Sequence, residues 1–185
     1  MIVIKEKDAV YFASPMKHQN FVRQAELDYS FEENGNIWHL NDGYGTIVMA
    51  SANERMVDLL RYSDVFDCEF SKEGMNRIVA NIKRLIRGTN CNMVKGRLGV
   101  SLCVARGNKG YKISPYGAVF EIGDIECFGE SEERILAAYE YCQSIPNVRE
   151  RIKTIYNQIS EFSHCQYYPI AVIHTKDESY SLLAK

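Results

Sequence analysis

The chain has 185 residues, of which 46% are hydrophobic and 25% are charged, and its formal net charge is −2. A chain of this length buries roughly 70% of the surface that its unfolded form exposes, so we expect a single domain over residues 1–185. The small net charge argues against nucleic acid as a partner, because binding to phosphates needs clustered Lys and Arg. No apolar run approaches the ~18 residues of a membrane span, which predicts a soluble, cytoplasmic protein without membrane contact.

The cysteines and histidines show no metal-binding spacing. Six cysteines lie at wide intervals without a Cys-x-x-Cys pair, and most stand inside apolar patterns. They are expected to be free buried thiols in a reducing compartment. The four histidines likewise lack the spacing of zinc ligands. We therefore predict neither a metal nor a cofactor.

The first half of the chain predicts two hairpins followed by two helices. Residues 1–15 contain two runs of strand formers around a Lys-Asp turn, and Asp42-Gly43 joins strands over 36–40 and 44–50. Ser51 and Glu54 have the spacing of a capping box, which predicts a helix from there to about residue 62. A second helix over 71–88 is indicated by apolar residues at helical spacing.

The second half repeats this order. Strands are predicted over 98–105, 111–113, 118–122 and 125–128, with turn sequences between them that favour antiparallel pairing. A helix over about 131–144 is ended by Pro146, and a capping box at Asn147 and Glu150 begins another. A last strand over 168–174 is followed by a polar tail over 175–185.

This order of elements predicts the fold class. A parallel doubly wound sheet needs a helix between each strand and the next, whereas here blocks of strands alternate with pairs of helices. We therefore predict an α+β protein, a four-layer αββα sandwich in which two antiparallel sheets stack face to face and a helix pair covers the outer face of each.

The same order, with several local strings, resembles the N-terminal-nucleophile (Ntn) hydrolases of the proteasome and HslV type. Residues 7–9 stand at the Lys-Asp-Gly-like turn of the first hairpin, and residues 36–53 match the strand pair that leads into the first helix. Residues 110–117 resemble the Leu-Tyr-x-Ile-Asp-x-x-Gly turn, and residues 127–131 stand where a Gly-Ser-Gly-type string precedes the third helix. The resemblance covers nearly the whole chain and implies the same sandwich.

The catalytic residues of that family are not matched. Its chemistry uses an N-terminal Thr, Ser or Cys as nucleophile, whose free α-amine, with a pKa near ~8, accepts the proton. By alignment of the first hairpin, that nucleophile would lie about two positions before Met1, and the bulky Ile2 disfavours removal of Met1. Pro15 stands where the family has Asp, and Asn36 stands where it has the Lys that lowers the pKa of the nucleophile.

The resemblance implies a cleft near Met1, Ser14, Asn36, Glu130 and Ser131, from which the catalytic groups are missing. Ser14 lies near this cleft, but no His or Lys is placed by the sequence to activate it, and a serine at a strand end is usually a turn residue. An acidic cluster of Asp124, Glu126 and Glu130 is better explained as solvated turns. We assign no catalytic residue.

The sequence therefore predicts a non-catalytic proteasome-like subunit that forms a homo-oligomer and acts as a scaffold or regulatory protein, with a possible protein partner. The alternative is an active peptidase or amide hydrolase with an unrecognised nucleophile or a different mature N-terminus. A third possibility is a small-ligand domain with a pocket lined by Ser14, Asn36 and Glu130.

Overall fold

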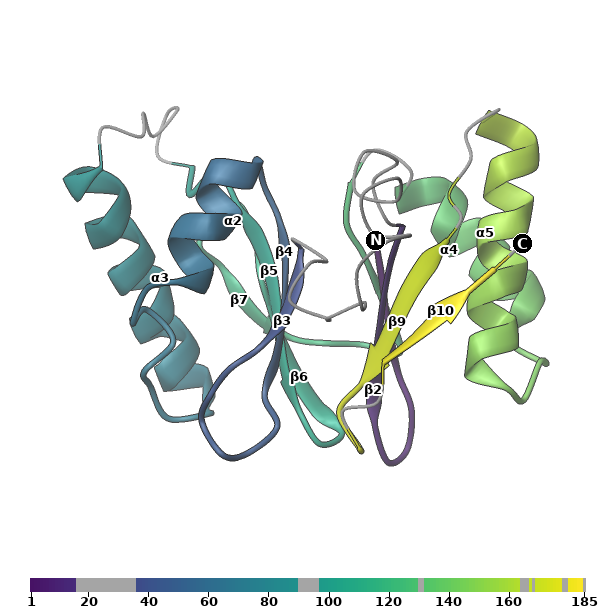
Figure 1. Cartoon of the computed structure of the whole chain (residues 1–185), viewed down its shortest axis with the longest axis horizontal. Coiled ribbons are helices and arrows are strands. Elements are labelled where there is room, and N and C mark those ends of the chain that lie inside the picture. Colours follow the sequence, from purple (N-terminus) through teal and green to yellow (C-terminus); the bar gives the residue numbers. More distant parts are fainter. Residues whose placement is uncertain are drawn as a thin grey trace, which may run out of the picture.

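A computed structural model describes residues 1–15, 36–89, 97–129, 132–163, 167, 169–177 and 180–184. Two five-stranded sheets stack face to face, and one pair of helices covers the outer face of each sheet (Figure 1). Neighbouring strands pair antiparallel throughout both sheets. The predicted four-layer αββα sandwich is confirmed.

The first sheet combines the two ends of the chain in the strand order β10-β9-β2-β1-β8. Helices α4 (Glu132–Cys142) and α5 (Val148–Ser163) cover its outer face. Its strands are β1 (Ile2–Lys5), β2 (Val10–Pro15), β8 (Ile125–Cys127), β9 (Ile170–His174) and β10 (Tyr180–Leu183).

The second sheet uses one continuous stretch of chain in the order β3-β4-β5-β6-β7. Helices α2 (Glu54–Arg61) and α3 (Lys72–Gly88) cover its outer face. Its strands are β3 (Ile37–His39), β4 (Ile47–Ser51), β5 (Ser101–Arg106), β6 (Lys109–Ile113) and β7 (Val119–Glu121). No helix among the described residues is long and apolar enough to cross a lipid bilayer.

Alternation along the strands fills three apolar layers. In β1, Val3 packs between the two sheets, while Ile2 and Ile4 pack against α4 and α5. In β2, Phe12 faces the other sheet and Ala13 faces the helices. Successive side chains of a strand point to opposite faces, so a strand buried on both faces carries apolar residues at nearly every position.

Two of the predicted helix starts are confirmed, and one is wrong. Ser71 caps α3, since its hydroxyl accepts from the Gly74 N–H at 3.1 Å, and the Asn147 side chain caps α5. The first helix begins later than predicted, because Ser51 still belongs to β4 and pairs with β5. Its cap is Asn53, whose Oδ1 accepts from the Met56 N–H at 2.9 Å.

Two other predictions need correction. The turn at residues 123–124 does not form a hairpin, because β7 is the edge of the second sheet whereas β8 pairs with β1 in the first. The chain changes sheets at this point. The segment after β9 was predicted to be a polar tail, but Tyr180–Leu183 forms the strand β10 along the edge of β9. This strand has four residues, and an alternation of polar and apolar side chains over so short a segment does not distinguish a strand from a polar terminus.

The two sheets are tied together at the end where the β1–β2 and β5–β6 turns meet. The Thr175 hydroxyl accepts from the Val10 N–H at 2.9 Å and donates to the Gly107 carbonyl, so it links β2, β9 and the β5–β6 turn. Asn108 donates to the Lys7 carbonyl at 3.0 Å. This is the closed end of the sandwich, lowermost in Figure 1.

Replacement of Thr175 by Val should lower the free energy of unfolding by about 1–3 kcal/mol, because it leaves a buried N–H and a carbonyl without their partner at nearly constant volume. Denaturant unfolding measures this loss. Thr154→Val is the matched control, since the Thr154 hydroxyl bonds only within α5 near the surface. Equal stabilities of the two variants would show that the Thr175 bonds do not hold the closed end.

Candidate functional site

Met1 lies at the opposite end of the sandwich from Thr175, on the inner face of the first sheet. Its α-amine donates to the Phe128 carbonyl at 3.0 Å, and its own carbonyl accepts from the Phe128 N–H at 3.0 Å. Met1 therefore continues the β1–β8 ladder beyond the strand. The Met1 and Phe128 side chains both pack in the apolar layer between the sheets.

Ser14 lies beside Met1. In the β1–β2 ladder Ile2 pairs with Ala13, so the next pair along is Met1 with Ser14. Ser14 lies on the same face of β2 as Phe12, which packs between the sheets. The Ser14 side chain is buried, and its hydroxyl donates to the neighbouring Pro15 carbonyl at 3.3 Å. This contact engages the hydroxyl with a backbone acceptor.

Asn36 is not brought to this place. Its carbonyl accepts from the Ala50 N–H at 2.8 Å, which extends the β3–β4 ladder by one pair. Ile37 packs between the sheets and Trp38 packs under α2 and α3, so alternation puts Asn36 on the helix side of its sheet. Of the predicted cleft residues, the structure thus brings together Met1 and Ser14. Glu130 and Ser131 lie outside the described residues.

Burial changes the acid-base chemistry of the α-amine. Loss of hydration disfavours the charged ammonium and lowers the pKa of the Met1 amine from 8.0 to about 6, while Cys127 partly offsets this effect. The amine is therefore largely uncharged at neutral pH. An uncharged amine can accept a proton, which is the state that a general base needs.

The thiols near this end are not activated. Burial raises the pKa of the Cys127 thiol to about 12, and burial also raises the pKa of the Cys103 thiol, to which the Glu126 carboxylate adds. The thiolate is the nucleophilic form of cysteine, so both residues are unreactive at neutral pH. Four described cysteines are free, as predicted: Cys68, Cys103, Cys127 and Cys142.

The sequence did not predict an ion pair that joins the two sheets. Lys112 of β6 approaches Glu126 of β8 with 2.8 Å between Nζ and Oε2, and both side chains are mostly buried. The Lys112 ammonium also lies 5.1 Å from the centre of the Phe128 ring. The pair could not be found from local sequence, because it joins strands of different sheets. In the sequence, only the alternation along β6 points to this pair. Tyr111 and Ile113 face the helices, so Lys112 between them faces the other sheet.

The described acidic residues around β8 bind cationic and backbone groups of the protein. Glu126 is held by Lys112 and by the Gly123 N–H, which donates to its Oε1 at 3.2 Å. Glu132, at the start of α4, is 3.9 Å from the Lys112 ammonium. Within the described ranges no three His, Cys, Asp or Glu side chains gather so as to hold a metal ion.

Comparisons with known proteins identify the fold. No protein-family model and no curated protein sequence matches the chain. Among solved structures, BPH of Thiobacillus denitrificans in complex with epoxomicin has a TM-score of 0.67 at 10% identity, and the alignment covers 94% of this chain and 96% of BPH. Anbu, the ancestral beta-subunit from Yersinia bercovieri, has a TM-score of 0.61 at 11% identity over 100% of this chain and 86% of Anbu. The chain has the proteasome-like Ntn hydrolase fold that the resemblance predicted.

The buried amine should make stability depend on pH. For the polypeptide whose first residue is Met1, the unfolded amine binds a proton below pH 8 while the folded amine binds it only below about 6. The free energy of unfolding should therefore fall between pH 8 and pH 6, by about 2 kcal/mol, and this contribution should stay constant below pH 6.

Comparison with the Nα-acetylated polypeptide separates this effect from those of all other ionisable groups, which the two chains share. The acetylated chain lacks the ionisable amine and should show the smaller pH dependence. The interpretation fails if the two chains lose the same stability between pH 8 and pH 6.

Proposed function

We propose that this protein is a non-catalytic proteasome-like subunit that acts as an oligomeric scaffold or regulatory binding protein. The observation that carries the proposal is the state of the polar groups at the Met1 end. The Ser14 hydroxyl bonds to backbone, Lys112 is paired with Glu126, and the nearby thiols are protonated at neutral pH. Nucleophilic catalysis needs a hydroxyl or thiol within reach of a base. In the part of the chain that the structure describes, the Ser14 hydroxyl binds the Pro15 carbonyl and the Lys112 ammonium binds the Glu126 carboxylate.

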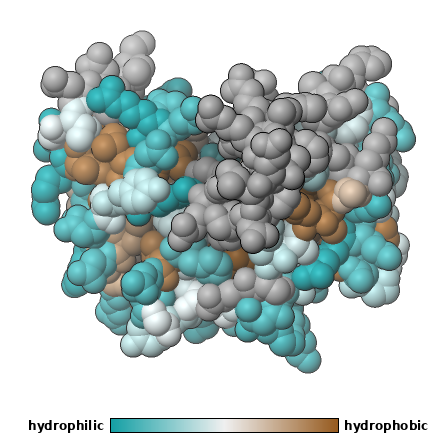
Figure 2. All heavy atoms as spheres, in the orientation of Figure 1, coloured by the Kyte–Doolittle hydropathy of each residue, from teal (hydrophilic) through white to brown (hydrophobic). Residues whose placement is uncertain are grey.

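Assembly is supported by the fold and by the surface. The similar structures include a proteasome-like beta subunit and Anbu, named as an ancestral beta-subunit. Several large side chains are more than half exposed on this chain, and aromatic residues are enriched where proteins contact each other. Figure 2 shows that hydrophobic patches lie over both halves of the molecule on the face in view. Within the described ranges, the most exposed aromatic residues are Tyr44, Tyr62, Tyr116, Phe120 and Tyr141.

The second candidate function is a working peptidase or amide hydrolase whose mature chain begins at another residue. Two observations favour it. BPH, which has the same fold, was solved with epoxomicin bound. The amine at the end of β1 also has a pKa of about 6, which suits a proton acceptor near neutral pH. Catalysis would require a nucleophilic side chain on the residue that carries this amine.

Epoxomicin distinguishes the two functions. We expect the purified protein to keep its intact mass after incubation with epoxomicin, and that mass to correspond to a chain that begins at Met1. A mass increase equal to one epoxomicin, or a mature chain that begins at Ser, Thr or Cys, would establish the hydrolase instead. BPH treated in parallel is the positive control.

Sedimentation tests the scaffold. At micromolar concentration the protein should sediment as an assembly of several copies, since a scaffold of this fold functions through contacts between subunits. Velocity runs over a tenfold concentration range measure the species present. A monomer throughout that range would contradict the scaffold proposal.

A further inference from the structure

The outer side of β7 is a strand edge. Among the described residues β7 is the last strand of the second sheet, with β6 on one side. The Ile122 N–H donates to the Gly110 carbonyl at 3.0 Å, and every second residue of an antiparallel strand bonds to the same neighbour, so Phe120 also bonds toward β6. Val119 and Glu121 therefore direct their N–H and C=O groups away from β6. Such backbone groups can pair with another extended segment.

Phe120 lies at the centre of this edge. It pairs with Lys112, which pairs with Cys103 in the layer between the sheets, so the Phe120 ring points to the inner face of the second sheet. Lys112 in turn binds Glu126 of β8, the edge strand of the first sheet. Because β8 lies opposite β6, β7 projects beyond the first sheet. The Phe120 ring is accordingly 55% exposed.

Two carboxylates share the Lys112 ammonium on this inner face. The Lys112 Nζ is 2.8 Å from the Glu126 carboxylate and 3.9 Å from that of Glu132. The Glu126 side chain is mostly buried, whereas half of the Glu132 side chain is exposed. The exposed carboxylate of Glu132 can therefore attract a further cation from outside the chain.

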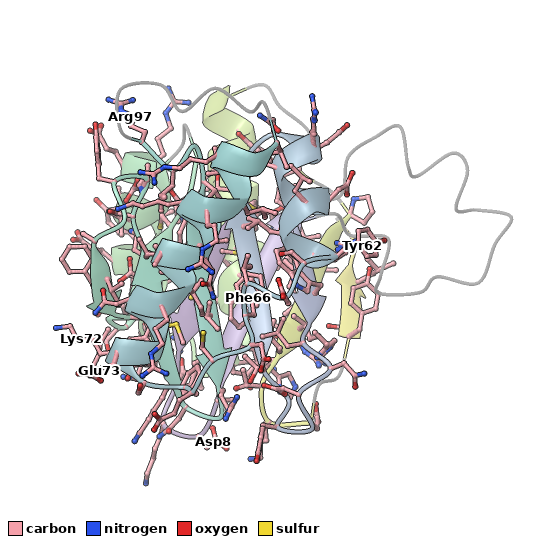
Figure 3. All side chains as sticks on the ribbon, turned by 90° about the vertical axis from the view of Figure 1, so that its left-hand side faces the viewer. Asp8, Tyr62, Phe66, Lys72, Glu73 and Arg97 are labelled. Atoms are coloured by element: carbon pink, nitrogen blue, oxygen red, sulfur yellow. The ribbon has the colours of Figure 1, made fainter. Side chains whose placement is uncertain are left out.

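Carboxylates also border the edge on the face that the helices cover. Burial raises the pKa of the Tyr111 phenol, and the Glu121 and Glu73 carboxylates add to this effect, so both lie near that ring. Glu121 is exposed in β7, and Glu73 is exposed in the first turn of α3, in the helix layer that faces the viewer in Figure 3. The edge thus combines an apolar centre with negative charge on both faces, which complements a basic and apolar partner.

We propose that β7 binds an extended segment of a partner protein as an added antiparallel strand, with an apolar side chain of that segment on Phe120 and a basic side chain beside Glu121. Opposite Phe120 the two strands form a non-hydrogen-bonded pair, in which side chains come closest. The residues on either side of it exchange backbone hydrogen bonds with Val119 and Glu121. In such strand addition the backbone supplies affinity and alternate side chains supply specificity. The inference rests on the proposed role as a regulatory binding protein and states the chemistry of the partner.

A short fluorescein-labelled peptide in which Lys alternates with Phe tests the edge by fluorescence anisotropy. The unmodified protein should bind this peptide, and Phe120→Ala should weaken binding roughly tenfold, because it removes the apolar contact. Leu182→Ala is the matched control, since Leu182 is an exposed apolar residue of the edge strand β10, and this variant should bind like the unmodified protein. Both side chains lie at the surface, so neither change should unfold the chain.

Two further arms test strand pairing and charge. The same peptide N-methylated at its Lys residues lacks the N–H groups that would be directed at β7, and it should not bind. Glu121→Lys should weaken binding of the Lys peptide and strengthen binding of a peptide in which Glu alternates with Phe. A merely structural role of Glu121 would not reverse the charge preference.

Three results would overturn the inference: no binding of the Lys peptide, equal binding to Phe120→Ala and the unmodified protein, or equal binding of the N-methylated peptide. If Phe120→Ala instead lowers the sedimentation coefficient of the protein alone, the edge joins copies of this chain, and the assignment of a partner segment is overturned. The proposed function is tested separately, because an epoxomicin adduct or a monomer in sedimentation contradicts it whether or not the peptide binds.

Discussion

The pairing of β1 between β2 and β8 is the interaction on which the Met1 end of the protein depends. A strand with neighbours on both edges satisfies its backbone hydrogen bonds, and its side chains are covered by the second sheet on one face and by helices on the other. The ladder continues through Met1 to Phe128. The α-amine is therefore held in a poorly hydrated place, which is the physical cause of its lowered pKa.

This environment explains why the same end of the sandwich is compatible with two functions. The fold supplies a buried amine that can accept a proton, yet a thioether is attached to it in Met1, and thioethers do not accept acyl groups. Nearby, Glu126 neutralises Lys112 between the sheets. An ion pair that joins two sheets serves their register and spacing, so we regard it as structural.

The fold could be predicted from the sequence because most of its signals are local. The Asp42-Gly43 turn, the capping box at Asn147 and the apolar spacing of α3 each act within a few residues, and together they specify hairpins and helix pairs. What could not be predicted is non-local. The change of sheet after β7 and the pairing of β10 with β9 depend on which strands meet in space. The same holds for the Lys112–Glu126 pair. Of the cleft residues that the resemblance implied, the structure brings together Met1 and Ser14.

The route of the chain through the two sheets has a consequence for how the protein folds. The second sheet, with α2 and α3, is built from one uninterrupted stretch and can form from contacts between near neighbours in sequence. The first sheet needs the β1–β2 hairpin to enter between β8 and β9, and its Val10 meets Thr175 across 165 residues. Contacts that close such long loops are slow to form. We therefore expect the half that carries β3 to β7 to become ordered first. The β1–β2 hairpin should insert between β8 and β9 late in folding and so complete the sandwich.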